Sequence, residues 1–139
     1  MTQSHETKLL VRYADTDRSG TVYHSNFFVW FEVGRVELMR SLGFSYKDME
    51  EQDDSNTVVV EVKCSYEKPA HYDDLIRVRT WVAESQRRTV RFAYEVFNDE
   101  TGQRLARGET LHVICDSQGR PRALPEKYRA AIPISSPAE

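Results

Sequence analysis

A single long apolar segment with helical spacing constrains the fold of this chain more than any other feature. Over residues 26–42 the apolar and small residues recur at steps of three and four, which is the spacing of one helix face. That face consists of Phe27, Phe31, Gly34, Leu38 and Leu42. Because Phe28 and Trp30 widen the stripe, we expect other elements to cover this helix on most sides. A glycine inside a helix is unfavourable by roughly 1 kcal/mol relative to alanine, so Gly34 predicts a close approach by another element.

The other long segments alternate in the manner of β-strands. One precedes the helix, over residues 8–13, and four follow it, over residues 57–66, 75–84, 89–97 and 103–115. In the first of these four, the alternation places apolar side chains toward the core, namely Val58, Val60, Val62, Cys64 and Tyr66. Short helices are predicted at residues 46–51 and 126–131, and Gly108 predicts a bulge in the last strand.

Helices and strands are segregated along the chain, which favours an α+β fold with a mainly antiparallel sheet. We expect five strands wrapped around the one long helix. A chain of 139 residues is large enough to bury one core, so residues 1–132 are predicted to form a single domain and residues 133–139 a flexible C-terminal tail. The edge and outer face of such a sheet remain available to a second copy, which predicts a homodimer.

The overall charge and hydropathy argue against several classes of partner. A net charge of −3 gives no electrostatic basis for binding a nucleic acid, and no apolar run approaches the ~20 residues of a membrane-spanning helix. The N-terminal residues are polar, so we expect no signal peptide. Cys64 and Cys115 lie in strand-like stretches, which predicts reduced thiols and a cytoplasmic protein. The four histidines lack the spacing of metal ligands, and we expect neither a metal nor a redox cofactor.

Two carboxylates and a histidine directly precede the long helix. Asp15, Asp17 and His24 belong to a turn-rich segment, and Ser25 or Asn26 is expected to cap the helix that follows. A helix N-terminus offers unpaired N–H groups and a partial positive charge of roughly +0.5. An acid or base beside such a terminus is the layout needed to attack a carbonyl and to stabilise the resulting oxyanion. The backbone N–H groups near His24 and Ser25 are the predicted oxyanion donors.

Four short motifs in this chain match those of a known family. They are Tyr13-x-x-x-Asp17, Gly20-x-Val22-Tyr23-His24-x-Asn26-Phe27, Phe31-Glu32-x-Gly34-Arg35-x-Glu37 and Tyr66-Glu67-x-Pro69-Ala70. Over residues 8–114 the chain resembles the hotdog-fold acyl-CoA thioesterases of the 4-hydroxybenzoyl-CoA thioesterase class, and within it the bacterial subgroup that accompanies the Tol–Pal envelope system. The resemblance implies a hotdog fold, an acyl-CoA substrate, homodimers or homotetramers made of dimers, and an active site at the subunit interface.

The resemblance also implies roles for individual residues. Asp17 acts on the thioester as nucleophile or as general base for water, the alternative being a turn aspartate that binds its own backbone. His24 assists by polarising water or the carbonyl or by protonating the leaving thiolate, unless it is a capping or dimer-contact histidine. Tyr13 orients the base or the carbonyl, unless it packs in the core. Asp15 is expected to hold the loop.

Arg87 and Arg88 lie at a predicted strand turn, and Arg91 follows them. Paired arginines at a sheet edge are suited to binding the phosphates of coenzyme A, the alternative being a solvated turn. The sequence therefore predicts an acyl-CoA thioester hydrolase. Two other functions stay open at this point: a hotdog-fold dehydratase or hydratase acting on hydroxyacyl or enoyl thioesters, and a non-catalytic acyl-CoA-binding module.

Overall fold

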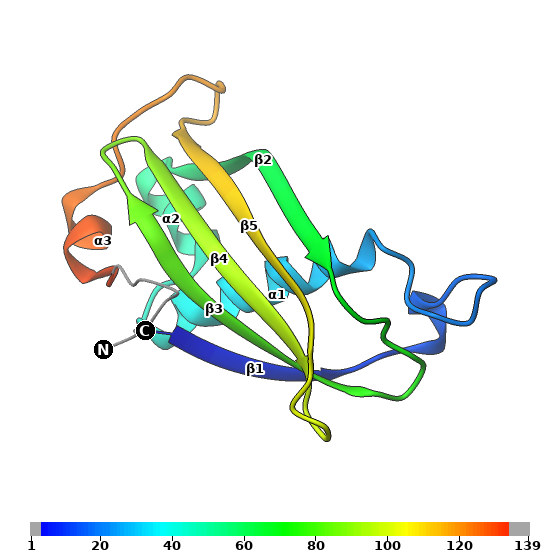
Figure 1. The fold of residues 1–139 in the computed structure, drawn as a ribbon. Helices are drawn as coiled ribbons and strands as arrows, with labels where there is room; N and C mark the ends of the chain where they lie inside the picture. Colours follow the sequence, from blue (N-terminus) through cyan, green and yellow to red (C-terminus); the bar gives the residue numbers. More distant parts are fainter. Residues whose placement is uncertain (1–3, 134–139) are drawn as a thin grey trace.

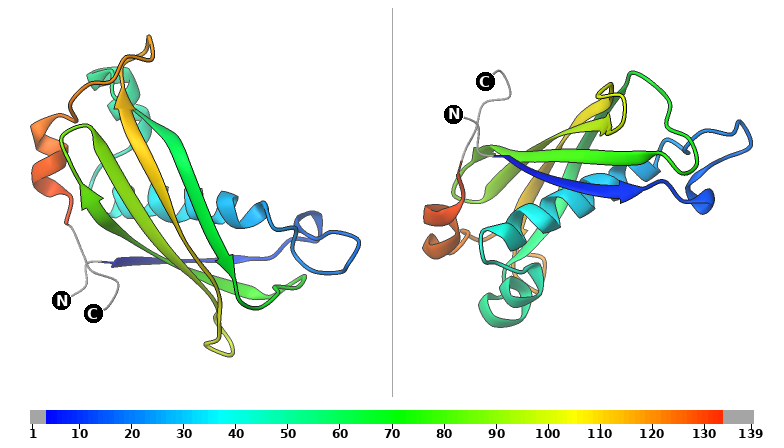
Figure 2. Two further views of the ribbon diagram at one scale, coloured as in Figure 1. Left: turned by 45° about the horizontal axis from the view of Figure 1, so that its top comes forward. Right: turned by 90° about the horizontal axis from the view of Figure 1, so that it is seen from below.

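The computed structural model describes residues 4–133 as one antiparallel sheet with three α-helices. The elements in chain order are β1 (Ser4–Leu10), the short 3-10 helix η1 (Tyr13–Asp15), α1 (Asn26–Ser41), α2 (Tyr46–Asp53), β2 (Asn56–Tyr66), β3 (Leu75–Ser85), β4 (Thr89–Asn98), β5 (Arg104–Cys115) and α3 (Glu126–Ala131). The strand order is β1-β3-β4-β5-β2. Figures 1 and 2 show α1 running along one face of this sheet. The predicted α+β architecture is confirmed.

Helix α1 packs against the sheet through the predicted apolar face. It contacts β1, β2, β3 and β4, and its Phe31 side chain is fully buried. Gly34 confirms the predicted close approach, because a Cβ there would collide with Thr80 Oγ1 and lie 3.0 Å from Val78 Cγ1 on β3. Gly43, with a φ of +90°, follows the C-terminal cap of the helix as expected.

The bulge predicted at Gly108 is wrong. Gly108 pairs in regular register with Cys64 on β2 and Tyr94 on β4. A Cβ at this position would instead collide with the Phe31 ring and the Lys63 carbonyl oxygen. The glycine is therefore explained by the close approach of the Phe31 ring and the β2 backbone to this position. Irregularities in the register lie elsewhere, as between Val59 and Glu61 on β2.

The first strand begins and ends earlier than predicted. It covers Ser4–Leu10 rather than residues 8–13, because Val11 leaves the ladder and its N–H donates to the carbonyl of Asp74. The chain then forms η1, closed by a hydrogen bond from the Asp15 N–H to the Arg12 carbonyl. Tyr13 consequently does not continue the inner face of the strand.

Strand β2 differs most from its prediction. It is an edge strand, and its valines are exposed at Val58 (45%), Val60 (54%) and Val62 (41%), as is Tyr66. The register shift between Val59 and Glu61 interrupts the strict alternation on which the prediction relied. In α1, Phe28 (36%) and Val29 (50%) are also exposed, so one side of the helix is uncovered in the single chain.

Several further predictions can be compared with the structure. Cys64 and Cys115 are both free thiols. The helices at 46–51 and 126–131 are present as α2, two residues longer, and as α3 with the predicted bounds. Within residues 4–133, no helix has the length and apolar character needed to cross a membrane. The flexible tail was predicted for residues 133–139, of which 134–139 lie outside the described residues.

Candidate active site

A short loop carries the predicted acid and histidine from η1 to the start of α1. The loop is closed by a β-bridge between Thr16 and Val22 and by a hydrogen bond from the Asp17 N–H to the Thr21 carbonyl at 2.9 Å. Gly20 turns the chain with a φ of +85°, a conformation that favours glycine. Figure 1 shows this loop projecting beyond the sheet at the end where β1 stops and β3 starts.

Asp15 is buried and ties the two ends of the loop together. Its carboxylate accepts hydrogen bonds from the Arg12 backbone N–H at 2.8 Å and from Arg12 Nη2 at 2.9 Å. Its carbonyl accepts from the Tyr23 N–H at 2.9 Å and from Asn26 Nδ2 at 2.8 Å. Burial raises the pKa of Asp15, but hydrogen bonds and charge from Arg12 outweigh it, so the pKa is lowered on balance. These contacts match the structural role expected for this residue.

Asp17 is exposed, and its two carboxylate oxygens differ in their surroundings. Oδ1 accepts hydrogen bonds from the Ser19 hydroxyl and from the Ser19 N–H, the latter at 2.8 Å, whereas Oδ2 receives none from residues 4–133. The Ser19 hydrogen bonds, with a smaller contribution from the charge of His24, lower the pKa of Asp17. The turn contact considered as the alternative is therefore present, but it uses one oxygen and leaves an ionised carboxylate with its other oxygen open.

His24 and Ser25 form the peptide that leads into α1, and both are exposed. In the described part of the chain, the N–H groups of His24 and Ser25 donate to no acceptor. Neither predicted cap is present: Ser25 has no side-chain cap hydrogen bond, and the Asn26 amide is engaged by the Asp15 carbonyl. The start of α1 thus keeps the unpaired N–H groups that oxyanion stabilisation requires.

A cavity of about 300 Å³ adjoins this helix start. Its walls are mainly apolar, with His24 and three charged or polar side chains around them; the lining residues are Val22, His24, Phe27, Tyr66, Glu67, Lys68, Pro69 and Ala70. The segment after β2 lines one side of the cavity, and it is joined to the loop by a hydrogen bond from the Val22 N–H to the Ala70 carbonyl at 2.9 Å. Of the predicted catalytic residues, His24 lines this cavity, whereas Asp17 and Tyr13 are not among its lining residues.

The Thioesterase-like superfamily model matches residues 11–132, nearly the whole described chain. The chain belongs to this superfamily. Among similar sequences, YneP of Bacillus subtilis is 37% identical over 123 residues, covering 88% of this chain and 86% of YneP. The Haemophilus influenzae acyl-CoA thioesterase YbgC is 32% identical over 124 residues, covering 88% of this chain and 89% of YbgC.

A solved structure of a thioesterase is also similar to this chain. The DHNA-CoA thioesterase of Staphylococcus aureus superposes with a TM-score of 0.88 at 33% identity, covering 92% of this chain and 87% of that one. The fold is the hotdog fold that the motifs indicated.

The sequence predicted no role for Tyr66, at the end of β2, or for the segment after it, although residues 66–70 line the cavity. Tyr66 donates a hydrogen bond to the His24 carbonyl at 2.8 Å, and its ring meets the Phe27 ring edge to face with centroids 5.1 Å apart. The signal was available, since Tyr66-Glu67-x-Pro69-Ala70 is one of the matched motifs. The motif alone did not indicate this hydrogen bond, because the two residues that it joins are 42 apart in sequence.

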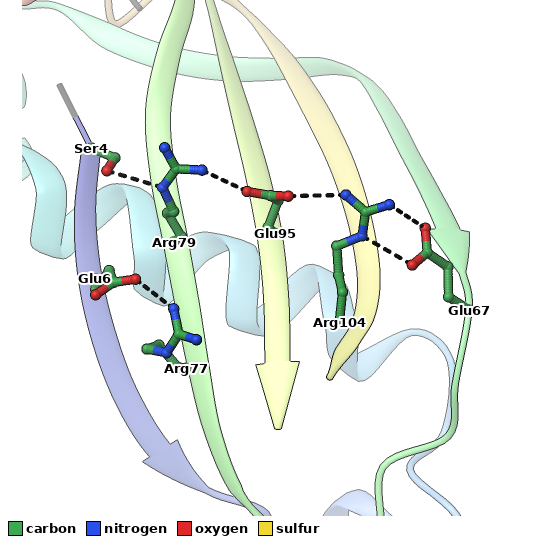
Figure 3. A network of polar contacts seen from close by, with 7 residues as sticks. All are labelled: Ser4, Glu6, Glu67, Arg77, Arg79, Glu95 and Arg104. Atoms are coloured by element: carbon green, nitrogen blue, oxygen red, sulfur yellow. Dashed lines mark hydrogen bonds and ion pairs between the residues drawn. The ribbon is translucent and has the colours of Figure 1, made fainter. Parts of the chain in front are cut away.

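The outer face of the sheet anchors this segment. An ion-pair ladder crosses the strands from Arg79 through Glu95 to Arg104 and ends at Glu67, as Figure 3 shows. Arg104 holds the Glu67 carboxylate with two hydrogen bonds of 3.0 Å, and these lower the pKa of Glu67. A larger hollow of about 530 Å³ lies beside this ladder, but it contains no residue of the loop that carries Asp17 and His24. The smaller cavity is lined by Val22 and His24 of that loop, and Asp17 lines neither of the two.

The structure also places Tyr13 and the three arginines that the sequence assigned to the site. Tyr13 is 79% exposed and meets Tyr72 edge to face at 5.9 Å, so the core-packing alternative is wrong. Arg87 and Arg88 are exposed at the β3–β4 turn, the whole length of β3 from the loop, which is roughly 30 Å. Arg91 lies 3.4 Å from Glu109. One chain alone does not bring these arginines to Asp17.

Proposed function

We propose that this protein hydrolyses acyl-CoA thioesters to a carboxylic acid and coenzyme A. The observation that carries the proposal is the ionised Asp17 carboxylate with one oxygen held by Ser19 and the other open, in the loop that leads to the unpaired amides of His24 and Ser25. The relatives named as acyl-CoA thioesterases support the same activity. The proposed substrates are acyl thioesters of coenzyme A as a class.

Hydrolysis of the thioester can follow two routes, which differ in the role of Asp17. With Asp17 as general base, it takes a proton from water, the resulting hydroxide attacks the carbonyl carbon, and the C–S bond breaks. With Asp17 as nucleophile, its oxygen forms an anhydride as the thiolate leaves, and water then hydrolyses the anhydride. In both, the N–H groups of His24 and Ser25 stabilise the oxyanion. His24 polarises the water or carbonyl or protonates the thiolate, Tyr13 orients the base or the carbonyl, and neither route needs a metal or redox cofactor.

We also propose a subgroup within the superfamily and an oligomeric state. The motifs favour the 4-hydroxybenzoyl-CoA thioesterase class and its Tol–Pal-associated subgroup, and a cytoplasmic location stays a prediction. A homodimer, or a homotetramer built from dimers, is supported by the exposed valines of edge strand β2, together with Phe28 and Val29 on α1. In such an assembly, the β3–β4 turn of a second subunit would supply Arg87 and Arg88 to the phosphates of coenzyme A.

The decisive experiment follows release of free thiol from a panel of acyl-CoA thioesters with a thiol-reactive dye. The variant is Asp17→Asn, and its matched control is Asp116→Asn, which alters another turn aspartate that accepts backbone hydrogen bonds, from Gln118 and Arg120. We expect Asp17→Asn to lower kcat by roughly 100-fold or more, while Asp116→Asn retains wild-type turnover.

Other outcomes identify the competing functions. Folded Asp17→Asn with wild-type turnover would rule out the proposed role of that carboxylate. Conversion of hydroxyacyl or enoyl thioesters without thiol release, detected by mass spectrometry, would indicate a dehydratase or hydratase. Binding of varied acyl-CoAs with no turnover would indicate a binding module.

A further inference from the structure

We propose that Tyr66 is a positioning residue that aims the Ser25 N–H at the oxyanion, an inference that rests on the function proposed above. Its hydroxyl donates to the His24 carbonyl oxygen at 2.8 Å. Among residues 4–133, the other donor to this oxygen is the Phe27 N–H, which is farther away at 3.3 Å. Tyr66 therefore makes the shorter of the two hydrogen bonds that orient the carbonyl at the entrance to α1.

The reason lies in the geometry of the peptide bond. The His24 carbonyl and the Ser25 N–H belong to one planar peptide group, and in a trans peptide they point in opposite directions. A bond that fixes the direction of the carbonyl also fixes the direction of the N–H. The Ser25 N–H thus points away from Tyr66, and it has no acceptor among residues 4–133. Donation to the carbonyl also polarises the peptide, which strengthens the N–H as a donor.

Tyr66 is itself held by the rigid sheet rather than by the exposed loop. It is the last residue of β2, and the N–H groups of Glu67 and Lys68 directly after it donate to the Leu105 carbonyl at 2.8 Å and 3.0 Å. Figure 3 shows Glu67 joined to Arg104 at the end of the ion-pair ladder. A hydroxyl held by the sheet therefore sets the orientation of a peptide in the loop before α1.

The hydroxyl stays a donor throughout the working pH range. Although 46% of the residue surface is exposed, desolvation of the hydroxyl, with smaller contributions from the neighbouring Cys64, raises the pKa of Tyr66 to about 12. The ring is also fixed by edge-to-face contacts with Phe27, at 5.1 Å, and with His24, at 6.4 Å. Removing the hydroxyl alone should leave these ring contacts in place, so Tyr66→Phe isolates the hydrogen bond.

The test compares Tyr66→Phe with Tyr128→Phe. The control residue, Tyr128, lies on α3 away from the site, and its hydroxyl donates to Asp53 on α2. Steady-state kinetics with the acyl-CoA that wild type hydrolyses best would be combined with the amide ¹H–¹⁵N resonance of Ser25. We expect Tyr66→Phe to lower kcat roughly 10- to 100-fold, to leave KM within about threefold, and to shift the Ser25 resonance. Tyr128→Phe should leave kcat, KM and that resonance unchanged.

The two readouts separate this inference from the proposed function. An unchanged kcat in Tyr66→Phe overturns the inference, and so does a lower kcat with an unshifted Ser25 resonance. A wild-type protein that releases no thiol from any acyl-CoA overturns the proposed function, whereas a shifted Ser25 resonance in Tyr66→Phe would still establish the aiming of the peptide.

Discussion

The ring of Phe31 lies flat on the ring of Tyr94, with centroids 4.2 Å apart and planes 9° from parallel. This stack joins α1 to β4 in the centre of the core and places the Tyr94 hydroxyl 2.6 Å from Thr110 Oγ1. Thr110 Oγ1 in turn lies 2.8 Å from Nε2 of the fully buried His112. The apolar core therefore encloses a short chain of polar side chains that ends at a titratable group.

His112 should make stability depend on pH. Burial, followed by the positive charge of Arg35, lowers its pKa from 6.5 to about 4. Between these values the unfolded chain binds a proton that the folded chain does not, so stability falls as the pH is lowered from 6.5 toward 4. The expected loss is at most about 3 kcal/mol.

Urea unfolding at pH 7 and pH 5, at fixed protein concentration, measures this dependence. His112→Gln should reduce the difference between the two pH values, and His71→Gln, which alters an exposed histidine, should preserve it. An equal pH dependence in wild type and His112→Gln would contradict the assignment.

Association should depend on strand β2. Val60 is 54% exposed on this edge strand, and a lysine there would place a charge within the proposed subunit contact. We expect Val60→Lys to shift the mass measured by light scattering toward that of a monomer. Leu10→Lys is the matched control, because Leu10 is 56% exposed on the opposite edge strand. Wild-type mass for Val60→Lys at every concentration would exclude this strand from the contact.

The β3–β4 turn should affect binding of coenzyme A rather than the chemical step. We expect replacement of both Arg87 and Arg88 by alanine to raise KM for acyl-CoA roughly 10-fold or more, with kcat little changed, because phosphate contacts act at a distance from the thioester. Arg91 should contribute less, since Glu109 already lies beside it. The same acyl group on N-acetylcysteamine, which lacks the phosphates, supplies the control. A similar rise in KM with that substrate would refute phosphate binding.

Local sequence patterns were sufficient to predict the long helix and the loop that carries Asp15 and Asp17. The apolar spacing from Phe27 to Leu38 predicted the buried face of α1, and Gly34 predicted the close approach of β3. The carboxylates of Asp15 and Asp17 were placed before the helix start from sequence order alone. These features depend on residues a few positions apart, so their spacing records them directly.

Tertiary structure alone decided which side chains are covered and which distant residues meet. The alternation in β2 is the same for an inner and an edge strand, so only the strand order shows that Val58, Val60 and Val62 are exposed. The Tyr66–His24 hydrogen bond and the separation of Arg87 from Asp17 follow from how the sheet folds around α1. No local spacing encodes them, because they result from packing between segments that are far apart in the chain.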